Sequence, residues 1–554
     1  MIFILVHVAL TSLVACGLGL VFGQVTPAVS WTALIVGTAV ASILAREKWT
    51  KNDFAPRNGW EWLAGIAGAL MVAKHFIFIF FKKGESLWTL NPLNLGDLPL
   101  HIAYIRHIST GHEFWPTNPI FSGQRLHYPL GMDLYNAVWD SIGVDLIQHL
   151  SLTGLVLGLV GVWALLQAWG WVGVFVLFFA FSAETHWKNF FLSMHITQRG
   201  FLFALPAGAL LMKLAWEHFV EGKRFPRKHY VVHGFLWGVM PLFHVHTFLA
   251  VSLTFLISMV SAQDKKFFDG VHRILPWGLL AVPLGLLVAG SGGGRLIHFS
   301  PGWMLEGRSL PVAWMNHLHI WWLVFYLGIW WLKRNKLTGQ LTFLVLHLGW
   351  WVVFNFLILA PWDWDNLKVM YWMILGALLP VGDHLRQSSN RVQVIFLASV
   401  VVTTLLPSAF QKHPNGILDS LRSVAHTNSA VELYRLDEIY RAQEALKEIR
   451  GGGPFLVHPT YNHPIGFWGR SLVMGYPGHI WSHGISDMGR EAQVRQIYKG
   501  EEGWKEALSK LAPRYIVWSD LEKKAYGSLN PDLSAKMRLV SSVQGFEIYE
   551  VTDP

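Results

Sequence analysis

The chain has 554 residues, of which 53% are apolar and only 14% are charged. A soluble globular domain usually carries about 25% charged residues, so most of this chain does not face water, which excludes a disordered, fibrous or coiled-coil protein and a single soluble enzyme. The net charge of +9 would suggest a nucleic-acid partner in a soluble protein, and the single Cys excludes a disulfide framework and a zinc site built on cysteines.

Apolar segments recur along most of the chain. A membrane-spanning helix needs about 20 mostly apolar residues. About 13 segments approach this requirement, so the sequence predicts a polytopic α-helical membrane protein. The predicted spans are 2–22, 28–45, 60–81, 149–168, 171–184, 201–219, 230–243, 247–262, 274–290, 317–332, 339–360, 368–382 and 392–408.

Basic residues in the short loops predict the orientation, because cytoplasmic loops carry an excess of Lys and Arg. One alternating set of loops is rich in them, and the other set holds fewer over far more chain. We therefore expect a multi-pass protein of the cytoplasmic membrane, with a cytoplasmic N-terminus and with the loop 82–148 and the tail after residue 408 outside. Topology then explains the positive charge, so we expect no nucleic-acid partner. The basic set comprises Arg46, Lys48, Lys51, Arg57, Lys223, Arg224, Arg227, Lys228, Lys265, Lys266, Arg273, Lys333, Arg334, Lys336, Arg386 and Arg391.

The two outer regions are patterned rather than irregular. In the loop 82–148, Leu98, Ile102, Ile105 and Ile108 recur at helical spacing and predict an amphipathic helix lying on the membrane surface. In the tail, a helical stretch at 429–449 precedes three short apolar runs that are separated by helical stretches around 488–498 and 502–511. This alternation predicts a small extracytoplasmic α/β domain. The apolar runs are 454–458, 514–519 and 545–551.

Asp97 is the strongest candidate for chemistry. It directly follows the third predicted span, so its carboxylate lies at the outer membrane–water boundary. Asp also favours the position that caps the start of a helix. Both roles remain open, because capping needs only one carboxylate oxygen.

A second candidate is the short outer loop "APWDWDNLKVMYW" at 360–372. Asp363 and Asp365 could bind a divalent cation, Mg²⁺ or Mn²⁺, through oxygen, and Lys368 could hold a phosphate. The alternative is an interfacial Trp and Lys anchor at a capped helix start.

Histidines and arginines near the membrane form a third group. Ionisable groups at membrane depth are costly and are therefore candidates for function. We expect His195, Arg199, His244 and His246 to bind phosphate or sugar. The alternatives are histidines that simply join helices by hydrogen bonds, and a zinc pair, for which H-x-H is a weak signal.

The tail segment 458–491 is dense in His, Asn, Tyr, Trp, Arg and Gly. Aromatic rings beside hydrogen-bonding groups suit sugar recognition, and Arg470 could pair with a phosphate. A loop network that stabilises the α/β domain is the alternative.

The segments "GDLPLH" (96–101), "GQRLHYPLG" (123–131), "WDWDNLKVMYW" (362–372) and 458–484 resemble segments of the GT-C class of membrane glycosyltransferases. The resemblance implies a catalytic base at Asp97 and a polyprenyl-phosphate sugar as donor. It also divides the chain into two additional N-terminal spans (1–59), a membrane domain (60–408) and the outer domain (409–554). Asp97 lacks the acidic neighbour that many members carry, and the WWDYG motif of oligosaccharyltransferases is absent.

Together these features predict an inverting glycosyltransferase that moves a sugar to a glycan, lipid or protein acceptor at the outer face of the membrane. Asp97 would deprotonate the acceptor, and cations would stabilise the leaving phosphate. The alternatives are a transporter or flippase of lipid-linked sugars and a glycan polymerase or ligase. A flippase would need paired charges deep in several spans, which the sequence does not show. The predicted substrate-binding residues are His101, Arg106, His195, Arg199, His244, His246, Lys368 and Arg470.

Overall fold

The computed structural model describes residues 1–45, 58–179, 190–262, 268–289, 297–305, 307–318, 321–396, 398–399, 430–449, 451–487 and 489–552. Some predicted features lie outside these residues. They are the basic residues Arg46, Lys48, Lys51, Arg57, Lys265 and Lys266, most of the predicted span 392–408, and the start of the tail at 409–429.

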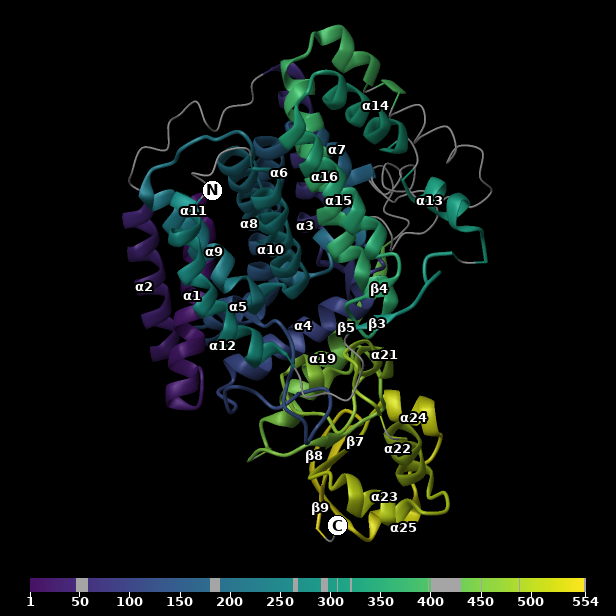
Figure 1. The fold of residues 1–554 in the computed structure, drawn as a ribbon. Coiled ribbons are helices and arrows are strands. Elements are labelled where there is room, and N and C mark those ends of the chain that lie inside the picture. Colours follow the sequence, from purple (N-terminus) through teal and green to yellow (C-terminus); the bar gives the residue numbers. More distant parts are fainter. Residues whose placement is uncertain are drawn as a thin grey trace.

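Helices make up most of the described chain and run alongside one another in a bundle, with the tail domain at one end and the N-terminus at the other (Figure 1). Polar side chains cap the first turns of several helices. The side chain of Asn58 accepts a hydrogen bond from the backbone N–H of Glu61 at the start of α3, and the side chain of Asp145 accepts one from the backbone N–H of Gln148 at the start of α6. The helices of the bundle are α1 (Ile2–Phe22), α2 (Pro27–Ala45), α3 (Gly59–Ile77), α6 (Leu146–Trp169), α7 (Trp171–Phe179), α8 (Arg199–Ala215), α9 (Arg227–Phe243), α10 (Val245–Ser261), α11 (Phe268–Ile274), α12 (Gly278–Val288), α13 (Leu310–Leu318), α14 (Trp321–Arg334), α15 (Thr338–Val353) and α16 (Leu367–Gln387).

Five helical stretches of the described chain are long and apolar enough to cross a membrane. Two further apolar helices, α10 and α15, are shorter. The chain is therefore a multi-pass, mostly helical protein, and the larger number of spans stays a prediction. The five stretches are Ile2–Phe22, Pro27–Ala45, Leu146–Trp169, Arg199–Val220 and Val271–Val288.

The predicted surface helix forms as α4 (Asn94–Ser109), and it is packed between other parts of the chain. Its apolar residues Leu98, Ile102, Ile105 and Ile108 are buried, and so is most of its other face. It packs against α5 (Gly131–Ser141) on one side and against the tail on the other. The apolar face that was predicted to meet the membrane therefore packs against protein, and the tail covers the face that the loop pattern alone leaves exposed.

A small sheet joins the loop to the tail. Strands β1 (Phe81–Lys83) and β2 (Ser86–Thr89) form a hairpin, and β2 pairs antiparallel with β5 (Val431–Arg435). The predicted span 60–81 therefore ends early, at Ile77, and the predicted helix 429–449 begins as a strand. Both differences have one cause. In the paired strands, backbone N–H and C=O groups form hydrogen bonds between strands and are not available for the hydrogen bonds of a helix. A second, two-stranded sheet pairs β3 (His298–Phe299) with β4 (Leu357–Ile358).

The tail is an α/β domain, as predicted. Its sheet has the order β6–β7–β9–β8, with β6 parallel to β7 and the other pairs antiparallel. The three predicted apolar runs are β6, β7 and β9, and β8 was not predicted. The strands are β6 (Phe455–Leu456), β7 (Tyr515–Trp518), β8 (Met537–Val543) and β9 (Phe546–Val551), and the helices are α19 (Leu436–Leu446), α20 (Pro464–Phe467), α21 (Pro477–Ser482), α22 (Arg490–Lys499), α23 (Trp504–Leu511), α24 (Asp520–Tyr526) and α25 (Pro531–Ser534).

Candidate active site

A cleft with a volume of about 270 Å³ lies where the bundle meets the tail. Five segments form it: the start of α4, the loop before α5, the turn before α8, the start of α16, and α21 of the tail domain. The helices among them are labelled in Figure 1. The two acidic segments predicted separately therefore meet in space. The cleft is lined by Leu93, Asp97, Leu100, Tyr128, Ser193, Met194, Thr197, Gln198, Trp362, Trp364, Asp365, Leu367, Lys368, His479, Ser482 and His483.

Asp97 lies in the first turn of α4 but does not cap it, because Leu93 occupies the cap position and no side chain caps the helix. The carboxylate is half-buried in the cleft wall. Loss of solvation raises the pKa of Asp97 above its ordinary value, although the charges of His101 and Lys368 and a hydrogen bond with Thr197 oppose this rise. An ionised carboxylate with a raised pKa is a stronger base, which suits proton abstraction.

Lys368 presents a positive charge to the same cleft. Its Nζ lies 3.0 Å from Oδ1 of Asp365, and the two side chains are only 15% and 22% exposed. The turn that carries them is held by Asn366, whose amide donates to the carbonyls of Phe354 (2.7 Å) and Leu357 (3.0 Å). No side chain caps the helix start here, so the capped-anchor alternative does not describe this loop.

The tail contributes two imidazoles to the cleft. Desolvation lowers the pKa of His479 to about 3 and that of His483 to about 4, so both rings are neutral at pH 7. The ring of His483 lies 5.0 Å from that of Tyr128, which in turn lies 5.9 Å from the ring of His101. Neutral imidazoles and phenols can both donate and accept hydrogen bonds, which is what sugar hydroxyls require.

A buried polar layer lies behind the cleft. Nδ1 of His101 is 2.8 Å from Oδ1 of Asp133, and both side chains are almost completely buried. Arg199 is 1% exposed and interacts electrostatically with Asp133 and Asp97. Among the described residues, Nε2 of His101, the hydroxyl of Tyr104, and Nε and Nη2 of Arg199 have no hydrogen-bond partner. Buried polar atoms are rarely left unpaired, so this layer is suited to a polar ligand.

Several predicted residues do not line the cleft. Arg106 pairs with Asp140 at 3.1 Å and lies over the Trp468 ring. His244 caps α10 by accepting a hydrogen bond from the Thr247 backbone N–H at 3.1 Å. The others are His195, whose ring lies 6.1 Å from that of Phe76, His246, whose ring lies 5.8 Å from that of His244, and Arg470, whose charge acts on His112.

The residues expected to hold a divalent cation do not form a metal site in the described part of the chain. Asp365 is paired with Lys368, whereas Asp363 lies 3.2 Å from Nε2 of His298 and does not line the cleft. No group of three or more His, Cys, Asp or Glu suited to a metal ion occurs among the described residues. We therefore derive no step through a metal.

Sequence reasoning missed Tyr128, Asp133, His479 and His483. Tyr128, His479 and His483 lie within segments that carry the family resemblance, "GQRLHYPLG" and 458–484, so these segments held a signal without singling out the residues. Asp133 is in the first turn of α5, where an acidic residue is ordinary, and nothing local distinguishes it.

No protein-family model and no curated protein matches the chain. The structure is similar to that of the oligosaccharyltransferase of Archaeoglobus fulgidus in its apo form, with a TM-score of 0.47 and 11% identity over 84% of this chain and 70% of that chain. The same enzyme tethered through a disulfide bond to an acceptor peptide containing the NVT sequon gives a TM-score of 0.46 at the same identity and coverage. Likeness at this level carries no information on activity, which has to be argued from the cleft.

Proposed function

We propose that this protein is an inverting glycosyltransferase that moves a sugar from a polyprenyl-phosphate donor to an acceptor at the outer face of the cytoplasmic membrane. The observation that carries the proposal is the meeting of Asp97 and Lys368 in one cleft, at the end of a bundle with membrane-spanning helices. In the proposed topology the N-terminus is cytoplasmic and the tail domain, 409–554, is outside. The acceptor is a glycan, a lipid or a protein.

The cleft supplies the two groups that direct displacement needs. Asp97 takes the proton of the acceptor hydroxyl as its oxygen forms a bond to the anomeric carbon. The bond from that carbon to the phosphate oxygen breaks, and its electron pair leaves with the phosphate. Lys368 stabilises the negative charge that develops there, and Arg199, buried behind the cleft, adds positive potential. A single displacement inverts the anomeric centre.

Neutral groups of the cleft are placed to orient the sugar. His479 and His483 carry no charge at pH 7, so they can hydrogen-bond sugar hydroxyls without competing for the phosphate. Trp362 and Trp364 line the same cleft and offer aromatic faces. The polyprenyl chain remains in the bilayer, where burial of its apolar surface is favourable.

The test compares the wild-type protein with Asp97→Asn, purified in lipid nanodiscs and supplied with a panel of radiolabelled polyprenyl-phosphate sugars and membrane extract as acceptor. Asp532→Asn, at an exposed position of the tail domain, is the matched control. Transfer by the wild type and the control but not by Asp97→Asn supports the proposal, as does inversion at the anomeric carbon.

Equal transfer by all three proteins would remove Asp97 from the mechanism. Retention of configuration would exclude a single displacement. Movement of intact lipid-linked sugars across proteoliposomes, with no transfer, would establish the transporter instead.

A further inference from the structure

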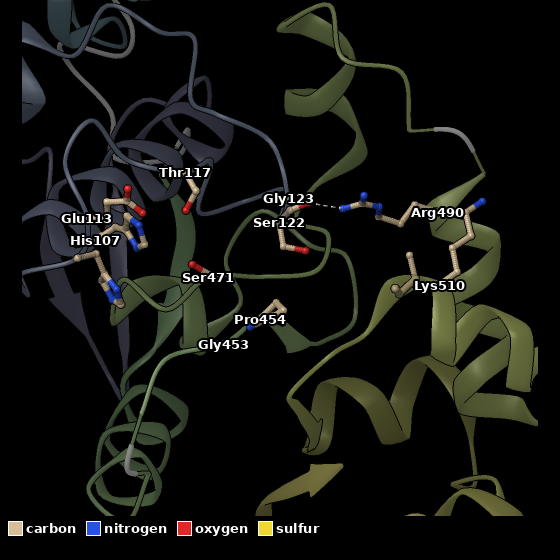
Figure 2. A pocket seen from close by; sticks show the side chains of 12 residues that line it. His107, Glu113, Thr117, Ser122, Gly123, Gly453, Pro454, Ser471, Arg490 and Lys510 are labelled. Atoms are coloured by element: carbon tan, nitrogen blue, oxygen red, sulfur yellow. Dashed lines mark hydrogen bonds between the residues drawn. The ribbon is translucent and has the colours of Figure 1, made fainter. Parts of the chain in front are cut away.

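A second and larger cavity, of about 500 Å³, lies between the outer loop and the tail domain (Figure 2). We call it the junction pocket and define it by the loop residues His107, His112, Glu113, Thr117, Ser122 and Gly123 and the tail residues Gly453, Pro454, Ser471, Arg490, Lys510 and Leu511. It shares no residue with the catalytic cleft. Its volume is within the range of about 300–1,000 Å³ that is usual for small-molecule sites.

The junction pocket is positively charged. Arg490 and Lys510 line it from the tail side, and Glu113 is the only acidic residue of its wall (Figure 2). Arg470 directly precedes the lining residue Ser471, and its charge acts on His112. The side chains of Arg470 and Lys510 make no hydrogen bond or ion pair with the residues that the structure describes. These cations are therefore not neutralised by the protein.

Hydrogen bonds and ring stacking hold several polar groups of the wall in place. Arg490 donates through Nη1 to the carbonyls of Ser122 (3.0 Å) and Val473 (2.8 Å), which ties the loop to the tail. The rings of His107 and His112 stack 4.1 Å apart, and Nδ1 of His107 is 2.8 Å from the Gly469 carbonyl. The hydroxyls of Thr117, Ser122 and Ser471 complete a surface that can pair with sugar hydroxyls.

The pocket and the cleft lie on shared elements. Asp97 is near the start of α4 and His107 near its end, about 15 Å apart at 1.5 Å per residue. In the tail, the segment from Ser471 in the pocket to His479 in the cleft makes the same connection. The same helix and the same tail segment therefore hold the two sites at a fixed separation.

We infer that the junction pocket binds an anionic saccharide, one that bears a carboxylate or phosphate, as part of the acceptor. The acceptor role rests on the proposed function, whereas binding itself does not. Lys510 and Arg490 in the wall, with Arg470 beside it, supply the affinity for the anion, and the hydroxyl groups select a sugar over a simple salt.

Binding to the full-length protein in nanodiscs tests this inference, with trigalacturonate as the carboxylate probe, glucose 6-phosphate as the phosphate probe and maltotriose as the neutral probe. We expect saturable binding of at least one charged probe, at least tenfold tighter than that of maltotriose and weaker at high salt. Arg470→Gln combined with Lys510→Glu should weaken it on the order of tenfold. Lys499→Glu, an exposed lysine of α22 outside the pocket, should not. Comparison of the two charged probes identifies the anionic group.

Equal affinities for charged and neutral probes, failure of both charged probes to bind, or equal loss in Lys499→Glu and the double variant would overturn the inference. Asp97→Asn separates it from the proposed function. That variant should bind the charged probe as tightly as the wild type but should not transfer sugar. Loss of binding would therefore count against the inference, and loss of transfer alone would not.

Discussion

The cleft and the junction pocket lie at opposite ends of α4 and differ in what they offer a ligand. The cleft is small, and its wall places a carboxylate of raised pKa beside one lysine and two neutral imidazoles. The junction pocket is larger and places Arg490 and Lys510 beside hydroxyl groups. A catalytic acid or base needs an environment that shifts its pKa, such as a desolvated cleft. A site that only binds part of the substrate needs complementary charge and hydrogen bonds. In our proposals the cleft therefore carries out the chemistry and the pocket retains the substrate.

The largest expected effect separates the two sites outright. Asp97→Asn should reduce kcat/KM for sugar transfer by about 10²–10⁴-fold, because the amide cannot take the acceptor proton. The same variant should unfold at a slightly higher temperature, since a carboxylate whose pKa rises on folding costs stability at neutral pH. Transfer kinetics and thermal unfolding check both effects. A variant with normal kcat/KM would assign the base elsewhere.

Lys368→Gln should have the second-largest effect. It should lower kcat by about 10²–10³-fold, because the leaving phosphate loses its neighbouring cation. Lys368→Arg should restore part of the rate because the charge remains. Steady-state kinetics with one donor measures both. If the Gln variant changes only KM, Lys368 binds the donor equally in the ground and transition states, and its proposed role is wrong.

The pH dependence of transfer sharpens the assignment of the base. Asp97 must be ionised, so kcat/KM should be lost as the pH falls through the raised pKa of this carboxyl, at a higher pH than an exposed Asp would give. His479 and His483, with pKa values of about 3 and about 4, should add no step near pH 6.5. A pH–rate profile measures this. A step near pH 6.5 that disappears in His483→Gln would show that a protonated imidazole takes part.

The smallest expected effect concerns the pocket. With a negatively charged acceptor, Lys510→Glu should raise KM several-fold and leave kcat unchanged. The effect on KM is small because an exposed charge interaction contributes little binding free energy. Lys499→Glu should alter neither. Initial rates at varied acceptor concentration distinguish these results. A lower kcat at unchanged KM would connect Lys510 to the reaction rather than to holding the acceptor.

The local sequence pattern was sufficient to predict those features that depend on residues close together along the chain. The apolar segments, the tail strands β6, β7 and β9, and the candidates Asp97, Asp365 and Lys368 were all predicted. Hydrophobic periodicity and acidic residues beside a span are local signals. They predict the folded structure correctly because each reflects whether a segment contacts lipid, the protein core or water.

Tertiary structure decided which candidates meet. His479 and His483 line the cleft beside Asp97 only because the tail folds back onto α4, and the same packing buries the apolar face of that helix. It also paired Arg106 with Asp140 and made His244 a helix cap. The sequence by itself determined a multi-pass helical protein with an α/β tail and reactive side chains beside its spans. Contacts between segments hundreds of residues apart decided the site, because side-chain proximity depends on packing, for which no local pattern codes.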